Sequence, residues 1–124
     1  NWLLSRPEVK KVFYPGLPGS EGYEICKKQA TGFGSMLTFE VESKELAFHV
    51  LKSTKLIPFA ESLGGVETLL TYPVTQTHAD VPEEIRLANG ITDKVLRLSA
   101  GVEDEKDLIA DLAQAFESFR EKAK

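Results

Sequence analysis

The sequence has few of the residues that build covalent or metal cross-links. Its 124 residues include one cysteine, Cys26, and two histidines, His49 and His78. A single cysteine excludes an internal disulfide framework and is compatible with a reducing compartment. One cysteine and two histidines are also a poor ligand set for a dedicated zinc site. We therefore expect a domain that contains neither disulfides nor a structural metal.

Long apolar runs and an excess of positive charge are also missing. No apolar stretch approaches the roughly 20 residues that a membrane-spanning helix needs, and no signal peptide opens the sequence. Fifteen basic and nineteen acidic residues give a net charge of -4, without the basic stripe of a nucleic-acid-binding protein. With 42% hydrophobic residues, the composition predicts one cytoplasmic globular domain that binds neither nucleic acid nor membrane.

Hydrophobic periodicity predicts strands and helices that intermingle along the chain. Residues 1–6, which precede Pro7, read as the end of a helix that starts outside the sequence. The other predicted elements are strands over 9–14, 36–41, 56–57 and 94–100, and helices over 20–30, 43–52, 82–89 and 105–122, of which the first two are capped by Ser20 and Ser43. The pattern predicts an α/β (α+β) two-layer sandwich, in which helices cover a small, mainly antiparallel sheet of about four strands.

Residues 61–78 fit neither a helix nor a strand, because Gly64 and Gly65 interrupt a mixture of apolar and hydroxyl residues. Two interpretations are open. This stretch is either a tight connection between two elements, or one wall of a binding site whose other wall is Arg97. The planar fork of an arginine on a strand suits bidentate binding of a carboxylate. The alternative is an arginine that pairs with a local acid such as Glu103.

Three other side chains carry groups that could take part in chemistry. Lys55 follows Ser53-Thr54, a context that resembles a Schiff-base lysine, but a solvated surface lysine is the simpler interpretation. His78 has no neighbouring nucleophile or paired base. Cys26 is best explained as a packed helix residue. No complete catalytic constellation is present, so we expect no catalytic residue in this chain.

Several motifs occur in a defined order between residue 9 and the C-terminus. They are Tyr14-Pro15-Gly16-Leu17, Gly32-Phe33-Gly34, Ser62-Leu63-Gly64-Gly65-Val66-Glu67, Thr77-His78, Arg97-Leu98-Ser99, Gly101-Val102-Glu103-Asp104 and Asp107-Leu108-Ile109-Ala110-Asp111-Leu112. Together they resemble the C-terminal domain of the pyridoxal-phosphate-dependent enzymes of cysteine and methionine metabolism. This family includes cystathionine γ-synthase, γ-lyase and β-lyase, and methionine γ-lyase.

The resemblance implies the small C-terminal domain of a fold-type I transferase, with residues 1–8 ending an inter-domain helix and residues 9–124 forming a substrate-binding domain. It implies that Arg97 binds the substrate α-carboxylate, that Ser62 and Leu63 line the same pocket, and that Thr77 helps to orient the arginine. Glu61 would meet the distal amino group of cystathionine in the γ-synthase and γ-lyase branch. The alternative for Glu61 is an acid at the mouth of the pocket.

The resemblance also implies a full-length enzyme that uses pyridoxal 5'-phosphate for γ-replacement or elimination on a homoserine ester or cystathionine. Such an enzyme would be a homotetramer, built as a dimer of dimers. Because the family's cofactor lysine belongs upstream, we expect this chain alone to bind no cofactor and to be inactive. Alternatives are the β-lyase, methionine γ-lyase or O-acetylhomoserine sulfhydrylase branch, a stand-alone binding module, or a structural role in an oligomer.

Overall fold

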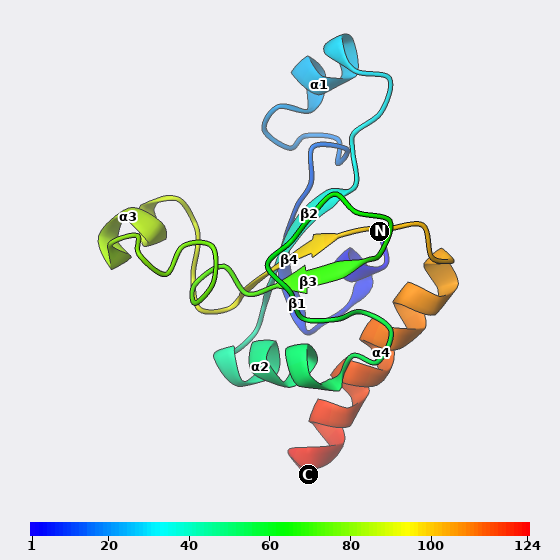
Figure 1. Cartoon of the computed structure of the whole chain (residues 1–124), viewed down its shortest axis with the longest axis vertical. Coiled ribbons are helices and arrows are strands. Elements are labelled where there is room, and N and C mark those ends of the chain that lie inside the picture. The colour runs from blue at the N-terminus through cyan, green and yellow to red at the C-terminus, as the bar shows by residue number, and fades with distance from the viewer.

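A four-stranded antiparallel sheet forms the centre of the computed structural model, which describes residues 1–124 (Figure 1). Its spatial order is β1-β2-β4-β3, and every neighbouring pair is antiparallel. The strands are β1 (Val9–Phe13), β2 (Met36–Val41), β3 (Leu69–Thr71) and β4 (Val95–Ser99), and the helices are the 3₁₀ turn η1 (Leu3–Ser5), α1 (Tyr23–Gln29), α2 (Lys44–Ser53), α3 (Glu83–Ala88) and α4 (Glu105–Lys122). The predicted two-layer fold with a small antiparallel sheet is confirmed.

Helices α2 and α4 lie together on one face of the sheet (Figure 1). Their apolar residues recur at helical spacing and meet the strand residues that point to the same face. The buried core includes Phe39, Val41, Leu46, Val50, Leu70, Leu96, Leu98, Leu112 and Phe116. Ser43 caps α2 as predicted, since its Oγ accepts a hydrogen bond from the Leu46 amide at 3.1 Å. The opposite face of β4, which carries Arg97, is left free of these helices.

The third strand of the sheet was predicted in the wrong place. Residues 56–57 form no strand, because the backbone amides of Leu56 and Ile57 donate to the carboxylate of Asp111 on α4, each at 2.9 Å. The strand lies instead at Leu69–Thr71, inside the stretch that resembled neither helix nor strand. All three of its residues are buried, so it shows no alternation of apolar and polar side chains.

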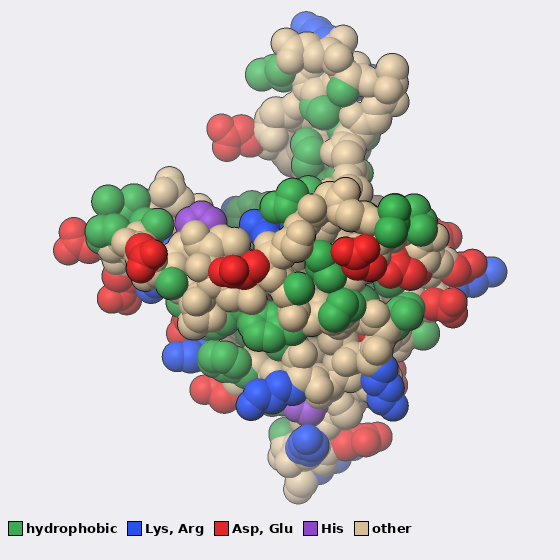
Figure 2. All heavy atoms as spheres, in the orientation of Figure 1, with side chains coloured by type: hydrophobic (Ala, Val, Ile, Leu, Met, Phe, Trp, Pro, Cys, Tyr) green, Lys and Arg blue, Asp and Glu red, His purple; other side chains and the backbone are tan.

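Residues 14–35 leave the sheet as an arm that carries α1, and Figure 2 shows this arm as a separate lobe of the surface. No residue of α1 is buried, so the arm is ordered mainly by its own contacts. The rings of Tyr23 and Phe33 stack with centroids 5.4 Å apart, and Tyr14 Oη donates to the carbonyl of Gly34 at 2.9 Å. Ser20 does not cap the helix as predicted; its Oγ donates to the Tyr14 carbonyl at 3.1 Å.

The buried carboxylate of Glu8 links the first eight residues to the C-terminal end of α4 through an ion pair. Glu8 is 1% exposed, and its carboxylate pairs with Arg6 at 3.1 Å and with Arg120 of α4 at 2.9 Å. Helical structure in this region is limited to the 3₁₀ turn Leu3–Ser5. Its assignment as the end of an inter-domain helix stays a prediction. Across all 124 residues, the structure has no helix with the length and apolar character needed to cross a bilayer.

Candidate functional site

Arg97 lies in the middle of β4, between Thr38 of β2 and Thr71 of β3 in the sheet register. Its Nη2 donates to the backbone carbonyl of Glu61 at 3.0 Å and to Thr71 Oγ1 at 3.4 Å. The Thr71 hydroxyl in turn donates to the Ala60 carbonyl at 2.6 Å, so the loop and the guanidinium share one threonine. This places Arg97 directly beside the loop that the sequence proposed as its opposite wall.

The guanidinium of Arg97 has hydrogen-bonding capacity that the chain does not use. Its Nε is buried and has no hydrogen-bond acceptor. No acid pairs with it, since the two ion pairs of the structure both involve Glu8. The suggested pairing with Glu103 is therefore wrong. An arginine held on a strand without a counter-ion is suited to bind an external carboxylate.

Glu103 is instead used to hold the loop. Its two carboxylate oxygens accept hydrogen bonds from the backbone amide of Thr68 at 2.8 Å and from the Thr68 hydroxyl at 2.7 Å. Both bonds favour the ionised form, so they hold the pKa of Glu103 below its usual value. The Thr68 oxygen also accepts from the Gly101 amide at 2.8 Å, which ties the loop to the turn after β4.

The predicted pocket-lining residues flank this arginine on an open surface. Glu61, Ser62 and Leu63 are exposed, and Leu63 retains 52% of its accessible area. Between Glu61 and Gly65 one backbone amide is hydrogen-bonded, that of Gly64, which donates to Ser99 Oγ at 2.8 Å. Ser99 lies two residues from Arg97 on β4, and therefore on the same face of the strand, but the sequence alone does not predict its contact with the loop.

Thr77 does not contact Arg97 in this structure. Its hydroxyl is 2.7 Å from His78 Nδ1, and the hydroxyl that does contact the guanidinium belongs to Thr71. Sequence reasoning missed Thr71 because it missed strand β3, whose register with β4 places this residue beside Arg97. The role of Thr77 in orienting the arginine stays a prediction.

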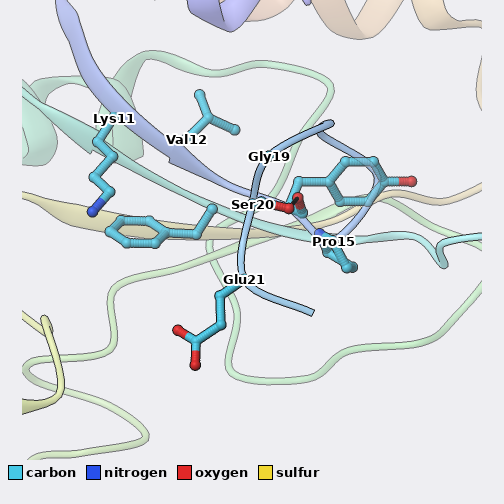
Figure 3. A pocket seen from close by; sticks show the side chains of 8 residues that line it. Lys11, Val12, Pro15, Gly19, Ser20 and Glu21 are labelled. Atoms are coloured by element: carbon cyan, nitrogen blue, oxygen red, sulfur yellow. Dashed lines mark hydrogen bonds between the residues drawn. The ribbon is translucent and has the colours of Figure 1, made fainter. Parts of the chain in front are cut away.

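The largest cavity lies away from this site, at the base of the arm. It has a volume of about 600 Å³ and is lined by residues of β1 and the following turn. Figure 3 shows Lys11 and Glu21 at separate places along it, and the two side chains form no ion pair. Lys11 Nζ lies 4.5 Å from the centroid of the Phe13 ring instead. None of the four cavities is lined by Arg97, Ser62 or Leu63.

The lysines of this chain do not fit the anchoring of pyridoxal phosphate. A lysine that forms an imine must be desolvated so that its amine is neutral at working pH. Lys55 is exposed at the end of α2, Lys94 is half-buried, and every other lysine is exposed. No group of three or more histidine, cysteine, aspartate or glutamate side chains is arranged to hold a metal ion. The group in this region with suitable chemistry for a ligand is the Arg97 guanidinium, whose charge and free donors suit an anionic group.

The sequence and structure of this chain are similar to those of enzymes that act on sulfur amino acids. Residues 1–117 match the family described as "Cys/Met metabolism PLP-dependent enzyme". The chain is 48% identical over 118 residues to the cystathionine gamma-lyase of Dictyostelium discoideum, and 50% identical over 118 residues to a cystathionine beta-lyase of Bacillus subtilis, covering 94% and 95% of this chain and 30% of each relative. The crystal structure of cystathionine gamma-lyase from Lactobacillus plantarum complexed with L-serine superposes with a TM-score of 0.88 at 41% identity, over 96% of this chain and 31% of that one.

The chain belongs to the pyridoxal-phosphate-dependent enzyme family of cysteine and methionine metabolism, because that family's match spans nearly all of it. It spans about 30% of the length of the curated relatives. The predicted family and the match to a fold-type I enzyme are thereby confirmed. The similar identities to a gamma-lyase and a beta-lyase do not select one branch of the family.

Proposed function

We propose that this chain is a substrate-binding domain in which Arg97 binds the α-carboxylate of an amino acid. The observation that carries the proposal is the guanidinium itself, which is fixed on β4 and has a buried Nε without an acceptor and no acidic partner. A ligand carboxylate would supply the missing negative charge and could accept a hydrogen bond from Nη1, since Nη2 is the one guanidinium nitrogen that bonds within the chain. The similar Lactobacillus plantarum enzyme was crystallised with L-serine, which supports an α-amino acid as the ligand class.

Three other residues have proposed roles in the same site. Ser62 and Leu63 are proposed to line the pocket, since they follow directly after the carbonyl that Arg97 contacts. Thr77 is proposed to help orient the guanidinium, a role for which Thr71 is the competing candidate because it already makes the contact. Comparing Thr77→Val with Thr71→Val separates the two: only the variant that removes the orienting hydroxyl should weaken carboxylate binding.

The catalytic step is proposed to use residues outside this chain. Pyridoxal phosphate supplies carbanion stabilisation in enzymes that bind it, and the lysines here are too exposed to anchor it. In the proposed enzyme, a homotetramer acting as a C–S lyase or transferase, this chain contributes binding and orientation of the substrate. Adding pyridoxal phosphate and then borohydride to the chain should label no specific lysine. A single stoichiometric adduct would contradict this division of roles.

A titration of the chain with L-serine, followed by NMR, tests the role of Arg97. We expect weak binding on an open surface, with a Kd of about 1 mM, and shifts centred on Arg97 and residues 61–64. Arg97→Ala should weaken binding roughly tenfold or more, because a charge-assisted pair is lost. Arg120→Ala is the matched control, since Arg120 lies on α4 and pairs with Glu8. Equal loss of binding in both variants, or none in Arg97→Ala, would refute the proposal.

The proposed substrate preference rests on Glu61. Its carboxylate is exposed and its backbone carbonyl contacts Arg97, so it can face an ammonium group at the far end of a ligand held by the arginine. On this basis we propose an enzyme of the γ-synthase or γ-lyase branch. Replacing Glu61 by Val should lower the affinity for L-cystathionine relative to L-methionine. If the ratio of the two affinities stays constant, Glu61 has no part in selectivity.

A further inference from the structure

The side chains of Arg97 and Ser99 hold the two ends of one short loop segment, residues 61–64. They are two positions apart on β4 and therefore point to the same face of the sheet. Arg97 Nη2 donates to the Glu61 carbonyl at 3.0 Å, and Ser99 Oγ accepts from the Gly64 amide at 2.8 Å. Ser62 and Leu63 lie between these two contacts. The distance between Glu61 and Gly64 is thus set by the distance between Arg97 and Ser99 on the strand.

Little else fixes the backbone of segment 61–64. Its residues are exposed and make no backbone–backbone hydrogen bond. Gly64 has φ +75°, a left-handed conformation that favours glycine, and in this conformation its amide reaches the buried oxygen of Ser99. Within segment 61–64, the hydrogen bond between Gly64 and Ser99 is therefore the one contact that fixes the backbone after Leu63.

We propose that Ser99 is a positioning residue, which holds Ser62 and Leu63 in place beside Arg97. The inference rests on the proposed carboxylate site and assigns Ser99 no contact with the ligand. Even a small displacement of a binding loop misaligns its ligand. An exposed segment without secondary structure therefore needs a side chain from another element to hold it in position. Ser99 supplies it from the same strand face as the arginine.

The effect of losing the Ser99 hydroxyl should stay within the segment, because the loop is anchored independently farther along. The Val66 carbonyl accepts from the Val102 amide at 2.8 Å, and Thr68 is held by Glu103 through two hydrogen bonds. These contacts do not involve Ser99. Ser99→Ala therefore releases Gly64 and leaves the end of the loop and β3 in place.

Amide hydrogen exchange on the whole chain measures this role directly. We expect the Gly64 amide to exchange about fivefold faster in Ser99→Ala, the factor that corresponds to one typical hydrogen bond. Ser99→Thr, which keeps the hydroxyl, should restore slow exchange. Ser43→Ala is the matched control, since it removes a serine hydroxyl that caps α2 without touching the loop. Unchanged exchange in Ser99→Ala, or equal acceleration in Ser43→Ala, overturns the proposal.

Titration of the same variants with L-serine separates this inference from the carboxylate proposal. In Ser99→Ala the Kd for L-serine should rise about threefold to tenfold, the effect of one lost hydrogen bond, while Ser43→Ala leaves it unchanged. If Arg97→Ala abolishes binding but Ser99→Ala binds as tightly as the unaltered chain, Ser99 has no positioning role. If the unaltered chain binds no L-serine, the carboxylate proposal fails, and the exchange rate of Gly64 still decides whether Ser99 holds the loop.

Discussion

Asp111 on α4 fastens the connection between α2 and β3, and its removal should unfold the domain more readily than any surface change. The side chain is 7% exposed and accepts hydrogen bonds from three consecutive backbone amides, of Lys55 at 2.8 Å and of Leu56 and Ile57 at 2.9 Å. In Asp111→Asn the shape is kept, but one oxygen becomes an NH₂ group that cannot accept. At least one backbone donor then loses its partner, and the others bond to a neutral acceptor.

The expected cost of Asp111→Asn follows from those two changes. An unsatisfied buried donor costs about 1–3 kcal/mol, and a bond to a charged group loses part of its strength, so the free energy of unfolding should fall by about 2–4 kcal/mol. For a chain of this length that lowers Tm by roughly 6–14 °C. Urea unfolding monitored by circular dichroism measures the change. Asp107→Asn, an exposed site in the first turn of the same helix, is the control and should cost less than about 1 kcal/mol.

A decrease of less than about 0.5 kcal/mol in Asp111→Asn, the range of an ordinary surface substitution, would refute the reasoning. It would mean that residues 55–57 find other acceptors or are solvated when the carboxylate is lost. A large decrease in both variants would point to the helix as a whole and not to the loop that Asp111 holds.

Two further changes probe other contacts of the fold. Burial, and secondarily the charge of Lys122, lower the pKa of His49 below its usual value of 6.5. The unfolded chain therefore binds the proton more tightly than the folded chain, so the free energy of unfolding is at its full value above pH 6.5 and should fall as the pH drops below it. Urea unfolding at a series of pH values measures this change, and His49→Gln should remove the pH dependence. In Gly101→Ala the new Cβ would lie against the Val66 carbonyl oxygen and 2.6 Å from the carbonyl carbon of Glu67. This clash should lower the free energy of unfolding by about 1–3 kcal/mol, measured by thermal unfolding. Gly32→Ala is the neutral control, because no atom lies within 4 Å of its new Cβ.

The elements that could be predicted from the sequence are those whose own pattern sets them. Helix α4 alternates apolar and polar residues at helical spacing, with acids in its first turn and bases in its last, and it was placed at its observed bounds. Helix α2 begins at the serine that caps it. In both cases the signal is local, because the side chains that define the element lie within it.

The parts that could not be predicted depend on contacts that the local sequence pattern does not reveal. Leu56 and Ile57 have the composition of a strand, but Asp111, 54 or 55 residues away, takes their amides. Strand β3 is buried on both faces, so periodicity gives no signal for it. Ser20 has the chemistry of a helix cap, yet it bonds to the Tyr14 carbonyl within the arm. Strand propensity is overridden by a contact distant in sequence at residues 56–57, whereas the Ser20 contact is local to the arm and β3 lacks a periodic signal.

The candidate site shows the same division between what is local and what is distant. That Arg97 and Ser99 share a strand face follows from the two-residue period of a strand. That this face lies against residues 61–64 follows from β3, whose register places Thr71 beside Arg97, and from the carboxylate of Glu103, which holds Thr68 directly before that strand. The loop has no secondary structure of its own, so polar side chains of other elements determine its course: Asp111 holds residues 55–57 before it, Ser99 holds Gly64 within it, and Glu103 holds Thr68 after it. The position of Ser62 and Leu63 is therefore a property of the whole fold, and substitutions at those supports should alter the site without touching its ligand.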